Sequence, residues 1–375
     1  MNSVARITNV SIKAMSGISK KPVYFLTMQG QNKPTITVKG ENKADRDTIT
    51  IADTEIAIKW SSKLMKNVSD SQVNTKIMEP TEVHIFKTKA RELLVREPDK
   101  LLPLSIGGLI WVKMPYVNDL SNADLFFKNK NNNWETAVKG IKDLFRRFSY
   151  PNTWIQLGRI LAVDIFDGNW DRFNSSGGWD NNGNVMFQKA ANGYRVTGLD
   201  TFDVKNTPDT NLNQPLSPQV QQHLQILMSD IRMREYATNV TTEIAGFILK
   251  AMGNAVGGGI DDFKMKAGGR KITITRKGEP DFFYGYIDDL CTGLKEGRDE
   301  IKRYLLEKVR QYDSQWIPTS RSLSTPRSTG FSMGSNKHSD IAVKTSAPAG
   351  FTTPSSLKTI PQGITDRMRY FRWIV

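Results

Sequence analysis

The sequence predicts an α+β fold with two parts, a small strand-rich part followed by a larger, mainly helical one. From Tyr24 to about Val117 the chain consists of short alternating or apolar runs with one strongly periodic helix. From about Asn133 to Gln311 apolar residues recur mainly at helical spacing. Near Ser314 the residues Ser, Thr, Pro and Gly become dense and this periodicity ends. The expected divisions are a first domain at 1–117, a second at 118–313 and a basic Ser/Thr/Pro-rich tail at 314–375.

Composition limits the class of protein. The 375 residues, 38% of them hydrophobic, suffice for two modest cores. No apolar run approaches the roughly 20 residues that span a bilayer, and residues 1–13 lack the apolar centre of a signal peptide. We therefore expect no transmembrane segment and a cytoplasmic location, or delivery into another cell's cytosol without a cleavable signal. One cysteine excludes an internal disulfide, and three widely spaced histidines argue against a Cys/His metal site.

The formal net charge of +14 attracts nucleic acid, anionic lipid and polyphosphate ligands alike, so it discriminates weakly between them. Residues 314–375 contain eight Lys or Arg against two acidic residues. Much of the excess charge therefore lies outside the second domain. We expect no stable nucleic-acid partner, although the basic tail could contact an anionic surface.

The first strands are predicted at 23–28 and 35–39, with a turn at 29–32 between them. Alternation in the second strand places Ile36 and Val38 on one face and Lys39 on the other, among small residues. Lys39 therefore has room beside it for a ligand, while a solvated strand lysine is the plainer alternative.

A helix is predicted next, with Asp53 or Thr54 as its N-cap and Ile56, Trp60 and Leu64 recurring every four residues. Glu55 at its start suits the helix dipole, which explains the residue without any functional role. Further strands are expected at 75–79 and 83–86, followed by a short helix at 91–95. The last strand of this part lies within 109–117 and ends at Pro115, which cannot donate to a ladder.

The most informative region follows a predicted buried helix at 154–166, which breaks at Asp167-Gly168-Asn169. Asp171 therefore lies in a loop directly after a rigid helix. Turn-forming residues fill 174–183, and Asn184 then begins a strand that we pair with residues 194–199 through an Asn-Gly turn. This hairpin would bring Asn184 and Asp200 to the same end, as two oxygen ligands of Mg²⁺ require.

The run Gly168-Asn169-Trp170-Asp171-Arg172, followed by Asn184-Val185-Met186-Phe187 and Gly198-Leu199-Asp200, resembles the catalytic segment of atypical protein-kinase-like enzymes. Enzymes with similar segments include actin-fragmin kinases, bacterial persistence-type toxin kinases, phosphoinositide kinases and secretory-pathway casein kinases. The resemblance spans roughly 23–305, with its specific motif within 164–203. It implies a two-lobed kinase-like fold, with a small β-rich N-lobe that contains one long helix and a larger, mainly helical C-lobe.

The resemblance also implies roles for single residues. Asp171 would be the catalytic base, while Asn184 and Asp200 would hold metal. Lys39 would contact the phosphates of ATP and Glu55 would hold Lys39 in place. Ser16 and Gly17 would stand for the glycine-rich loop, and the backbone of Val112, Lys113 and Met114 would face the adenine ring. Phe173 replaces the usual histidine, and Asn184 follows Asp171 later than in the family, so Asn174 is an alternative metal ligand.

These roles imply an ATP- and Mg²⁺-dependent kinase that transfers the γ-phosphate to a Ser or Thr hydroxyl of a protein substrate. A second reading keeps the fold but assigns nucleotidyl transfer, or phosphorylation of a lipid or small molecule. A third is non-enzymatic: a basic protein that binds nucleic acid or an anionic surface. The periodic segments at 217–252 and 282–311 are expected to be packing helices, with a short strand at 271–275 between them.

Overall fold

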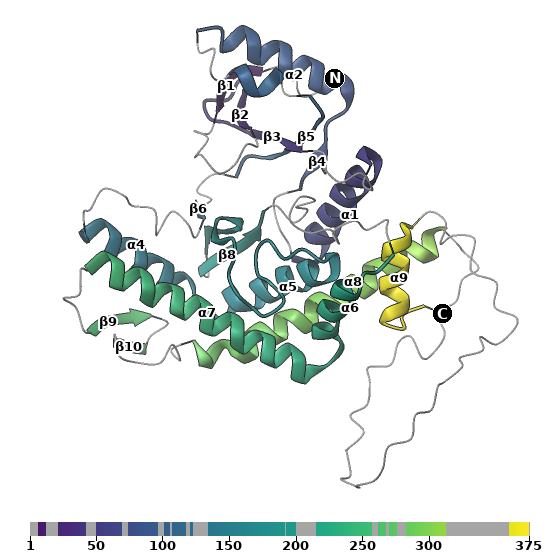
Figure 1. Cartoon of the computed structure of the whole chain (residues 1–375). Helices are drawn as coiled ribbons and strands as arrows, with labels where there is room; N and C mark the ends of the chain where they lie inside the picture. Colours follow the sequence, from purple (N-terminus) through teal and green to yellow (C-terminus); the bar gives the residue numbers. More distant parts are fainter. Residues whose placement is uncertain are drawn as a thin grey trace, which may run out of the picture.

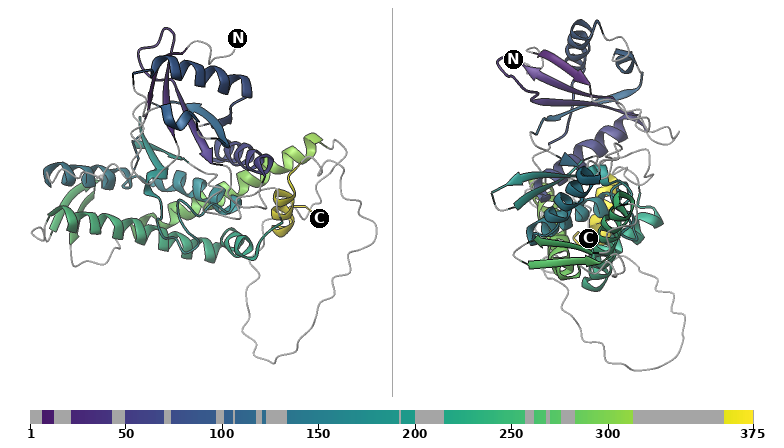
Figure 2. Two further views of the ribbon diagram at one scale, coloured as in Figure 1. Left: turned by 45° about the horizontal axis from the view of Figure 1, so that its top comes forward. Right: turned by 90° about the vertical axis from the view of Figure 1, so that its left-hand side faces the viewer.

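The chain folds as a mixed α+β protein, as the sequence predicts. The computed structural model describes residues 7–12, 22–42, 50–69, 74–96, 101–105, 107–117, 121–122, 134–191, 193–199, 215–256, 262–267, 270–275, 283–312 and 360–374. Its buried apolar side chains form a cluster in the sheet with its covering helix, a larger one among the helices, and a small third one of Ile58, Ile110 and Val112. Figures 1 and 2 show the sheet and helix α2 on one side of helix α1, and the other helices on the opposite side.

The main sheet is antiparallel and has five strands in the order β1-β2-β3-β5-β4. The strands are β1 (Ile7–Ile12), β2 (Val23–Met28), β3 (Ile36–Asn42), β4 (Lys76–Ile77) and β5 (Leu109–Pro115). The strands predicted at 23–28, 35–39 and 109–117 are confirmed, and β5 ends at Pro115. The register places Lys39 between Val23 of β2 and Val112 of β5.

Helix α2 (Pro80–Leu93) covers one face of this sheet. Its Phe86 lies 5.3 Å, between ring centroids, from both Tyr24 and Trp111. The strand predicted at 83–86 is therefore wrong. Pro80 occupies the first turn, where its missing N–H costs nothing, and the Glu82 side chain accepts a 3.2 Å hydrogen bond from the Glu79 backbone N. These start signals outweigh the β-branched residues that favoured a strand.

Helix α1 (Ile51–Ser69) packs on the opposite face of the sheet and connects it to the helical part. Ile58 packs against Ile110 and Val112 of β5, whereas Trp60 and Leu64 belong to the helical core. The helix begins earlier than predicted, because Thr50 and Asp53 bond reciprocally: the Thr50 N and Oγ1 donate to Asp53 Oδ2, and Asp53 N donates to Thr50 Oγ1. The predicted N-cap at Asp53 or Thr54 is therefore replaced by Thr50.

The helical part is built around α5 (Pro151–Asp167), whose residues from Ile160 to Asp167 are all buried. Against it lie α1 and α8 (Ile287–Tyr312), with α4 (Trp134–Arg147), α6 (Pro218–Leu224), α7 (Asp230–Val256) and α9 (Gln362–Tyr370) around them. The single helix predicted at 217–252 is instead α6, a 3₁₀ turn at Gln225–Met228 and α7. Ser217 caps α6 by accepting a 3.2 Å hydrogen bond from Val220 N.

Two smaller antiparallel sheets complete the fold. One consists of β6 (Ser121–Asn122), β7 (Val185–Ala190) and β8 (Gly193–Gly198), the other of β9 (Asp262–Ala267) and β10 (Arg270–Thr275). The predicted hairpin is confirmed: Val185 pairs with Gly198 and Ala190 with Gly193, whose φ of 117° requires glycine. The strand expected at 271–275 is present as β10.

The C-terminal residues 360–374 are part of the core, so the tail expected at 314–375 is not uniform. Ile364, Met368 and Trp373 are buried in the helical cluster. The part of the tail before Ile360 lies outside the described residues. None of the described helices combines the length and the apolar character needed to cross a membrane.

Candidate active site

The loop that contains Asp171 is held at the end of α5. The helix stops at Asp167 because Gly168 adopts a left-handed conformation, with φ 78°, and its backbone N–H donates back into the last turn. Residues 168–174, here termed the Asp171 loop, therefore leave the buried end of α5 at a fixed point. The sequence predicts this break, and the structure confirms it.

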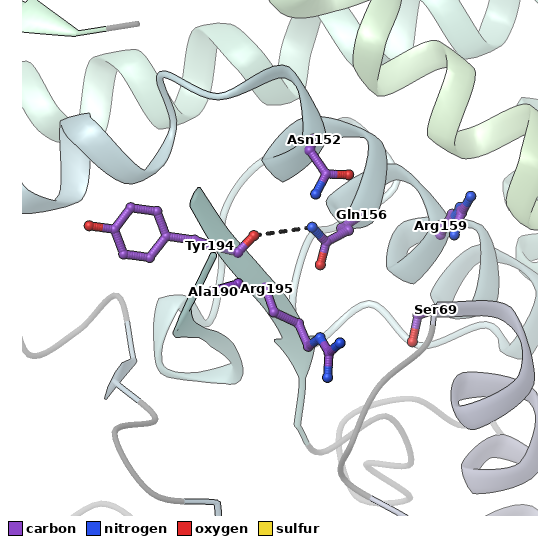
Figure 3. Close-up of a pocket in the computed structure, with 7 residues that line it drawn as sticks. All are labelled: Ser69, Asn152, Gln156, Arg159, Ala190, Tyr194 and Arg195. Carbon is purple, nitrogen blue, oxygen red and sulfur yellow. Dashed lines mark hydrogen bonds between the residues drawn. The ribbon is translucent and has the colours of Figure 1, made fainter. Parts of the chain in front are cut away.

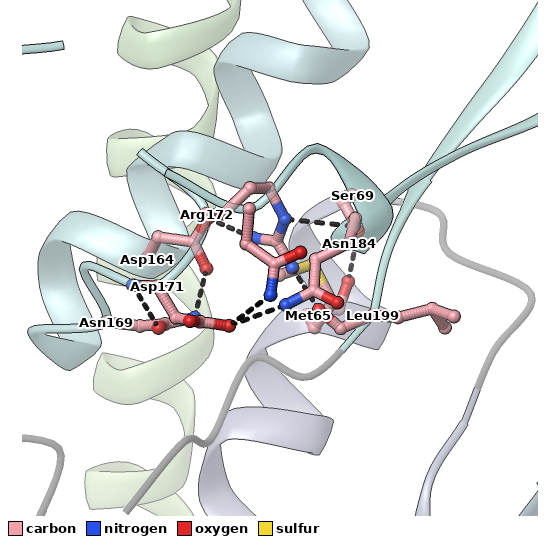
Figure 4. A network of polar contacts seen from close by, with 9 residues as sticks. Met65, Ser69, Asp164, Asn169, Asp171, Arg172, Asn184 and Leu199 are labelled. Carbon is pink, nitrogen blue, oxygen red and sulfur yellow. Dashed lines mark hydrogen bonds and ion pairs between the residues drawn. The ribbon is translucent and has the colours of Figure 1, made fainter. Parts of the chain in front are cut away.

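A buried ion pair lies beneath the loop. The Arg172 guanidinium contacts the Asp164 carboxylate, and their side chains are 0% and 2% exposed (Figure 4). Arg172 Nε donates to the Asn184 carbonyl at 3.1 Å, and a terminal nitrogen donates to the Leu199 carbonyl at 2.5 Å. One side chain therefore joins α5, the Asp171 loop, the start of β7 and the end of β8.

The backbone of the loop is set by Asn169, which is fully buried. Asn169 Nδ2 donates to Asp164 Oδ1 at 3.0 Å, and its Oδ1 accepts from the Asp171 N–H at 3.1 Å. On the other side of the loop, the Trp170 Nε1–H donates to His223 Nδ1. Burial lowers the pKa of His223 to about 3, so the ring stays neutral and able to accept. Asp171 therefore follows a segment whose polar groups are fixed.

The Asp171 carboxylate lies among side-chain amides. Its Oδ2 accepts from Asn184 Nδ2 at 2.7 Å (Figure 4). The same oxygen also accepts from Asn181 Nδ2 at 3.0 Å. Asn184 is 6% exposed, and the bond from its nitrogen leaves the amide oxygen as the atom suited to a cation. The structure thus brings the predicted base and one predicted metal ligand together.

The alternative metal ligand, Asn174, has a different environment. Its Oδ1 accepts from the backbone N–H groups of Ser176 at 3.0 Å and Gly178 at 2.9 Å. This is the pattern of an asparagine that stabilises its own turn. Of the two alternatives left open by the sequence, Asn184 is the one hydrogen-bonded to Asp171.

The segment that leads to Asp200 is described as far as Leu199, whose N–H donates to the Asn184 carbonyl at 3.0 Å. Gly198 precedes it, and a Cβ at this position would lie 2.7 Å from a terminal nitrogen of Arg172, so glycine is needed for the close approach. Asp200 itself lies outside the described residues, as do Ser16 and Gly17.

Lys39 lies buried on the sheet face that α1 covers, but its partner differs from the predicted one. Its ammonium is 2.7 Å from Glu41 Oε1, two residues further along β3 on the same face. Among the described residues no contact joins Lys39 to Glu55, so the predicted pair is corrected. Helix α1 presents Ile58 to the sheet, and Glu55 is exposed on the same stripe as Lys59.

The backbone groups proposed to face adenine are only partly available. Val112 and Lys113 pair with β3 on one side and with β4 on the other, so both lie inside the ladder. Met114 pairs with Thr37 of β3 and lies beyond Lys76, the first residue of β4, which pairs with Lys113. The Lys113 side chain points to the α2 face, where it forms an ion pair with Glu82. Of the three predicted residues, Met114 is the one that pairs with β3 but not with β4.

Sequence reasoning missed Asp164, Asn169, Asn181 and Glu41. Asp164 had a signal, because it is the single charged residue in the apolar run from Ile160 to Phe166, and a charge there needs a partner. The three others had none, since Asn and Glu are common in turns and strand ends for local reasons.

The hairpin that carries Asn184 is fixed to α5 by Gln156. Its Nε2 donates to the Tyr194 carbonyl at 3.1 Å and its Oε1 accepts from Val196 N at 2.8 Å, which pins β8 to the helix. Beside this contact is a cavity of about 210 Å³ (Figure 3). It is lined by Ser69, Asn152, Gln156, Arg159, Ala190, Tyr194 and Arg195. Asp171 and Asn184 are not part of this lining.

Stability should fall as the pH rises from about 4 to about 8, because of Asp167 at the end of α5. Burial raises the pKa of Asp167 to about 7, although the Ser61 hydroxyl and the positive charge of Arg367 act to lower this pKa. The unfolded value is about 3.9, so between these values only the folded state binds the proton. The contribution of Asp167 to the free energy of unfolding is therefore complete below the pKa of the unfolded state and is lost as the pH rises through about 7. It amounts to at most about 4 kcal/mol.

Urea unfolding at pH 5 and pH 8 measures this term. Asp167→Asn, which cannot ionise, should reduce the difference between the two pH values, whereas Asp288→Asn at an exposed position should leave it unchanged. An Asp167→Asn protein with the wild-type difference would show that Asp167 is not the group responsible.

Neither a protein-family model nor a curated protein sequence matches this chain. Within the described residues, no group of three or more His, Cys, Asp or Glu side chains is placed to hold a metal ion. The side chains of Asn184 and Asp200, the two metal ligands predicted from the sequence, carry oxygen donors of the kind that Mg²⁺ accepts. The chemistry of the cluster therefore has to be inferred from its own geometry.

Proposed function

We propose that this protein is an ATP- and Mg²⁺-dependent kinase of the atypical kinase-like type, acting on a Ser or Thr hydroxyl of a protein. The observation that carries the proposal is the buried Arg172. It joins the Asp171 loop to Asn184 and to Leu199, the residue before Asp200. A phosphotransferase needs a hydroxyl-orienting carboxylate beside oxygen ligands for metal, held rigidly. The arrangement of sheet, bridging α1 and helical part supports a two-lobed kinase-like fold.

In this proposal Asp171 orients the substrate hydroxyl and accepts its proton as the oxygen attacks the γ-phosphate. The amides of Asn181 and Asn184 hold the carboxylate through Oδ2. The Asn184 oxygen and Asp200 would hold Mg²⁺. When bound, ATP supplies the phosphoryl group, and Mg²⁺ supplies the positive charge that neutralises its oxygens. Lys39 would contact the α and β phosphates, and Glu41, rather than Glu55, would position its ammonium.

Asp171→Asn should reduce transfer of label from [γ-³²P]ATP to a generic protein substrate by about 10²–10⁴-fold, because the hydroxyl loses its proton acceptor. The fold should persist, since an amide still fits beside Asn181 and Asn184. The measurement is labelled transfer per folded protein, with folding followed by circular dichroism and thermal unfolding.

The matched control is Asp180→Asn, which removes an exposed acid of the neighbouring turn and should keep activity within about threefold. ATP labelled at the α position separates phosphoryl from nucleotidyl transfer, since only the latter leaves this label on the product. Wild-type protein that is neither stabilised by Mg-ATP nor able to transfer either label would refute the proposal. Full activity of Asp171→Asn would refute the role of Asp171.

A further inference from the structure

The C-terminal helix α9 carries a buried arginine. Arg367 is 1% exposed, although arginine is among the residue types that are rarely buried without partners. Its Nε donates to the Phe166 carbonyl at 2.5 Å, and one terminal nitrogen donates to the Asp167 carbonyl at 3.2 Å. The other terminal nitrogen donates to Gly363 O at 2.9 Å within α9.

These contacts are directed at the C-terminal end of α5. The last carbonyls of a helix lack partners within it and carry the negative end of the helix dipole, so a guanidinium there is favourable. Hydrogen bonds that involve a charged donor are among the strongest in proteins. Arg367 therefore fixes the two residues directly before Gly168, where the Asp171 loop begins.

The aromatic rings of the same segment pack on the same helix end. Phe166 stacks on Trp373, with centroids 6.1 Å apart and planes 6° apart, and on Phe371 at 6.3 Å. Phe371 and Trp373 in turn stack on each other at 4.7 Å. The C-terminal residues thus enclose the last turn of α5 by packing as well as by hydrogen bonds.

A second route runs from α9 to the loop through α6. The Tyr370 hydroxyl donates to the Gln221 carbonyl of α6 at 3.0 Å. Two residues further along α6, His223 accepts the hydrogen bond of Trp170, the residue before Asp171. The C-terminal segment therefore reaches both sides of the loop, from a position about two hundred residues away in sequence.

We propose that Arg367 is a positioning residue for the Asp171 loop, and that residues 360–374 must be seated on α5 for the site to be ordered. The consequence for activity rests on the proposed function, whereas the consequence for the order of the loop does not. The hydrogen bonds described for Arg367 go to α5 and to α9, and none of them goes to Asp171 or Asn184.

Hydrogen exchange of the full-length protein, followed by mass spectrometry, tests the ordering. In Arg367→Gln, amides of residues 168–173 should exchange about tenfold faster or more than in the wild type. Amides in the first half of α5 and in α7 should change much less. Arg369→Gln is the matched control: it removes the same charge from the same helix, but the partner of its partly exposed side chain among the described residues is Asp366, one turn away.

Kinetics supply the second readout. Arg367→Gln should lower kcat about tenfold or more with the KM for ATP within about threefold, and Arg367→Lys should recover part of the loss, because an ammonium keeps the charge but not the fork of donors. Exchange at 168–173 equal to that of Arg369→Gln would overturn the inference. So would uniformly faster exchange across all helices, which indicates a general loss of stability.

Two safeguards keep these outcomes separate. If Arg367→Gln does not fold, Arg367→Lys decides by the same comparison of exchange at 168–173 with the rest of α5. If the wild type transfers no phosphate, the proposed function fails while the exchange result still supports or overturns the positioning role.

Discussion

Replacement of Arg172 by methionine should lower the free energy of unfolding by about 3–5 kcal/mol, because it leaves the Asp164 carboxylate buried without its partner. The same change removes the donors to the Asn184 and Leu199 carbonyls. Asn184 and the end of β8 then lose their common anchor beside Asp171. A misplacement of about 1 Å at a reacting group can cost about 10²-fold in rate, so transfer activity should fall by at least this factor.

Chemical unfolding of the purified variant measures the stability change, and its pH dependence identifies the cause. Burial raises the pKa of Asp164, against the pull of Arg172 and Asn169, and without Arg172 the carboxylate takes up a proton more readily. The loss of stability should therefore be smaller at pH 5 than at pH 8. The double variant Asp164→Asn/Arg172→Met should lose less stability than the sum of the two single variants. The reason is that Asp164→Asn removes the carboxylate that Arg172→Met leaves unpaired.

Arg159→Met is the matched control on the same helix. Arg159 pairs with Glu296 at 2.8 Å, but the two side chains are 30% and 43% exposed. An exposed pair contributes about 0–1 kcal/mol, so this variant should differ little from the wild type. If Arg172→Met were no more destabilising than Arg159→Met, the buried pair could not be the anchor of the site.

The elements predicted correctly from the sequence are those whose signals are local. The alternation of Ile36 and Val38, the proline that ends β5 and the Asn-Gly turn of the hairpin all act within a few residues. The break after α5 is equally local, because Gly168 supplies the left-handed conformation. These signals were sufficient to place Asp171 in a loop after a buried helix and Asn184 at the start of β7.

The predictions that were wrong concern contacts between distant segments. Glu55 has the right residue type and the right order to hold Lys39, but the rotation of α1 is decided by the packing of Ile58 on β5. For residues 360–374, which follow a long polar stretch, the sequence left the packing open, and Ile364, Met368 and Trp373 complete the helical core. Sequence patterns indicate which residues are apolar, but not which surface they cover.

In the candidate site, too, local signals were informative and contacts between distant segments were not. Asp171 and Asn184 were identified from their order along the chain, whereas the buried network that holds them was not. Asp164 indicated a buried charge, because it is a lone acid in an apolar run. Its partner, Arg172, lies eight residues further along, in the loop after the helix. Because a buried charge needs compensation, such an acid should direct attention to the nearest arginine that can reach it.

Replacement of Gly293 by alanine should lower the free energy of unfolding by about 3 kcal/mol, because α5 and α8 cross with their backbones in contact. A Cβ on Gly293 would overlap the Ile155 carbonyl and lie 2.9 Å from the Gly158 Cα. A Cβ on Gly158 would lie 2.8 Å from the Gly293 Cα, so each glycine faces the other. The atoms in the way belong to backbone, which cannot turn aside, so the helices must separate.

Gly246→Ala in α7 is the matched control, because nothing lies within 4 Å of a Cβ at that position. Alanine there should stabilise the helix by about 0.5–1 kcal/mol, the usual difference in helix propensity. Thermal or urea unfolding of the two variants should thus give changes of opposite sign. A stabilised Gly293→Ala protein would mean that α5 and α8 are further apart than described. The position of α5, from whose end the Asp171 loop begins, would then have to be reconsidered, since α8 packs against α5.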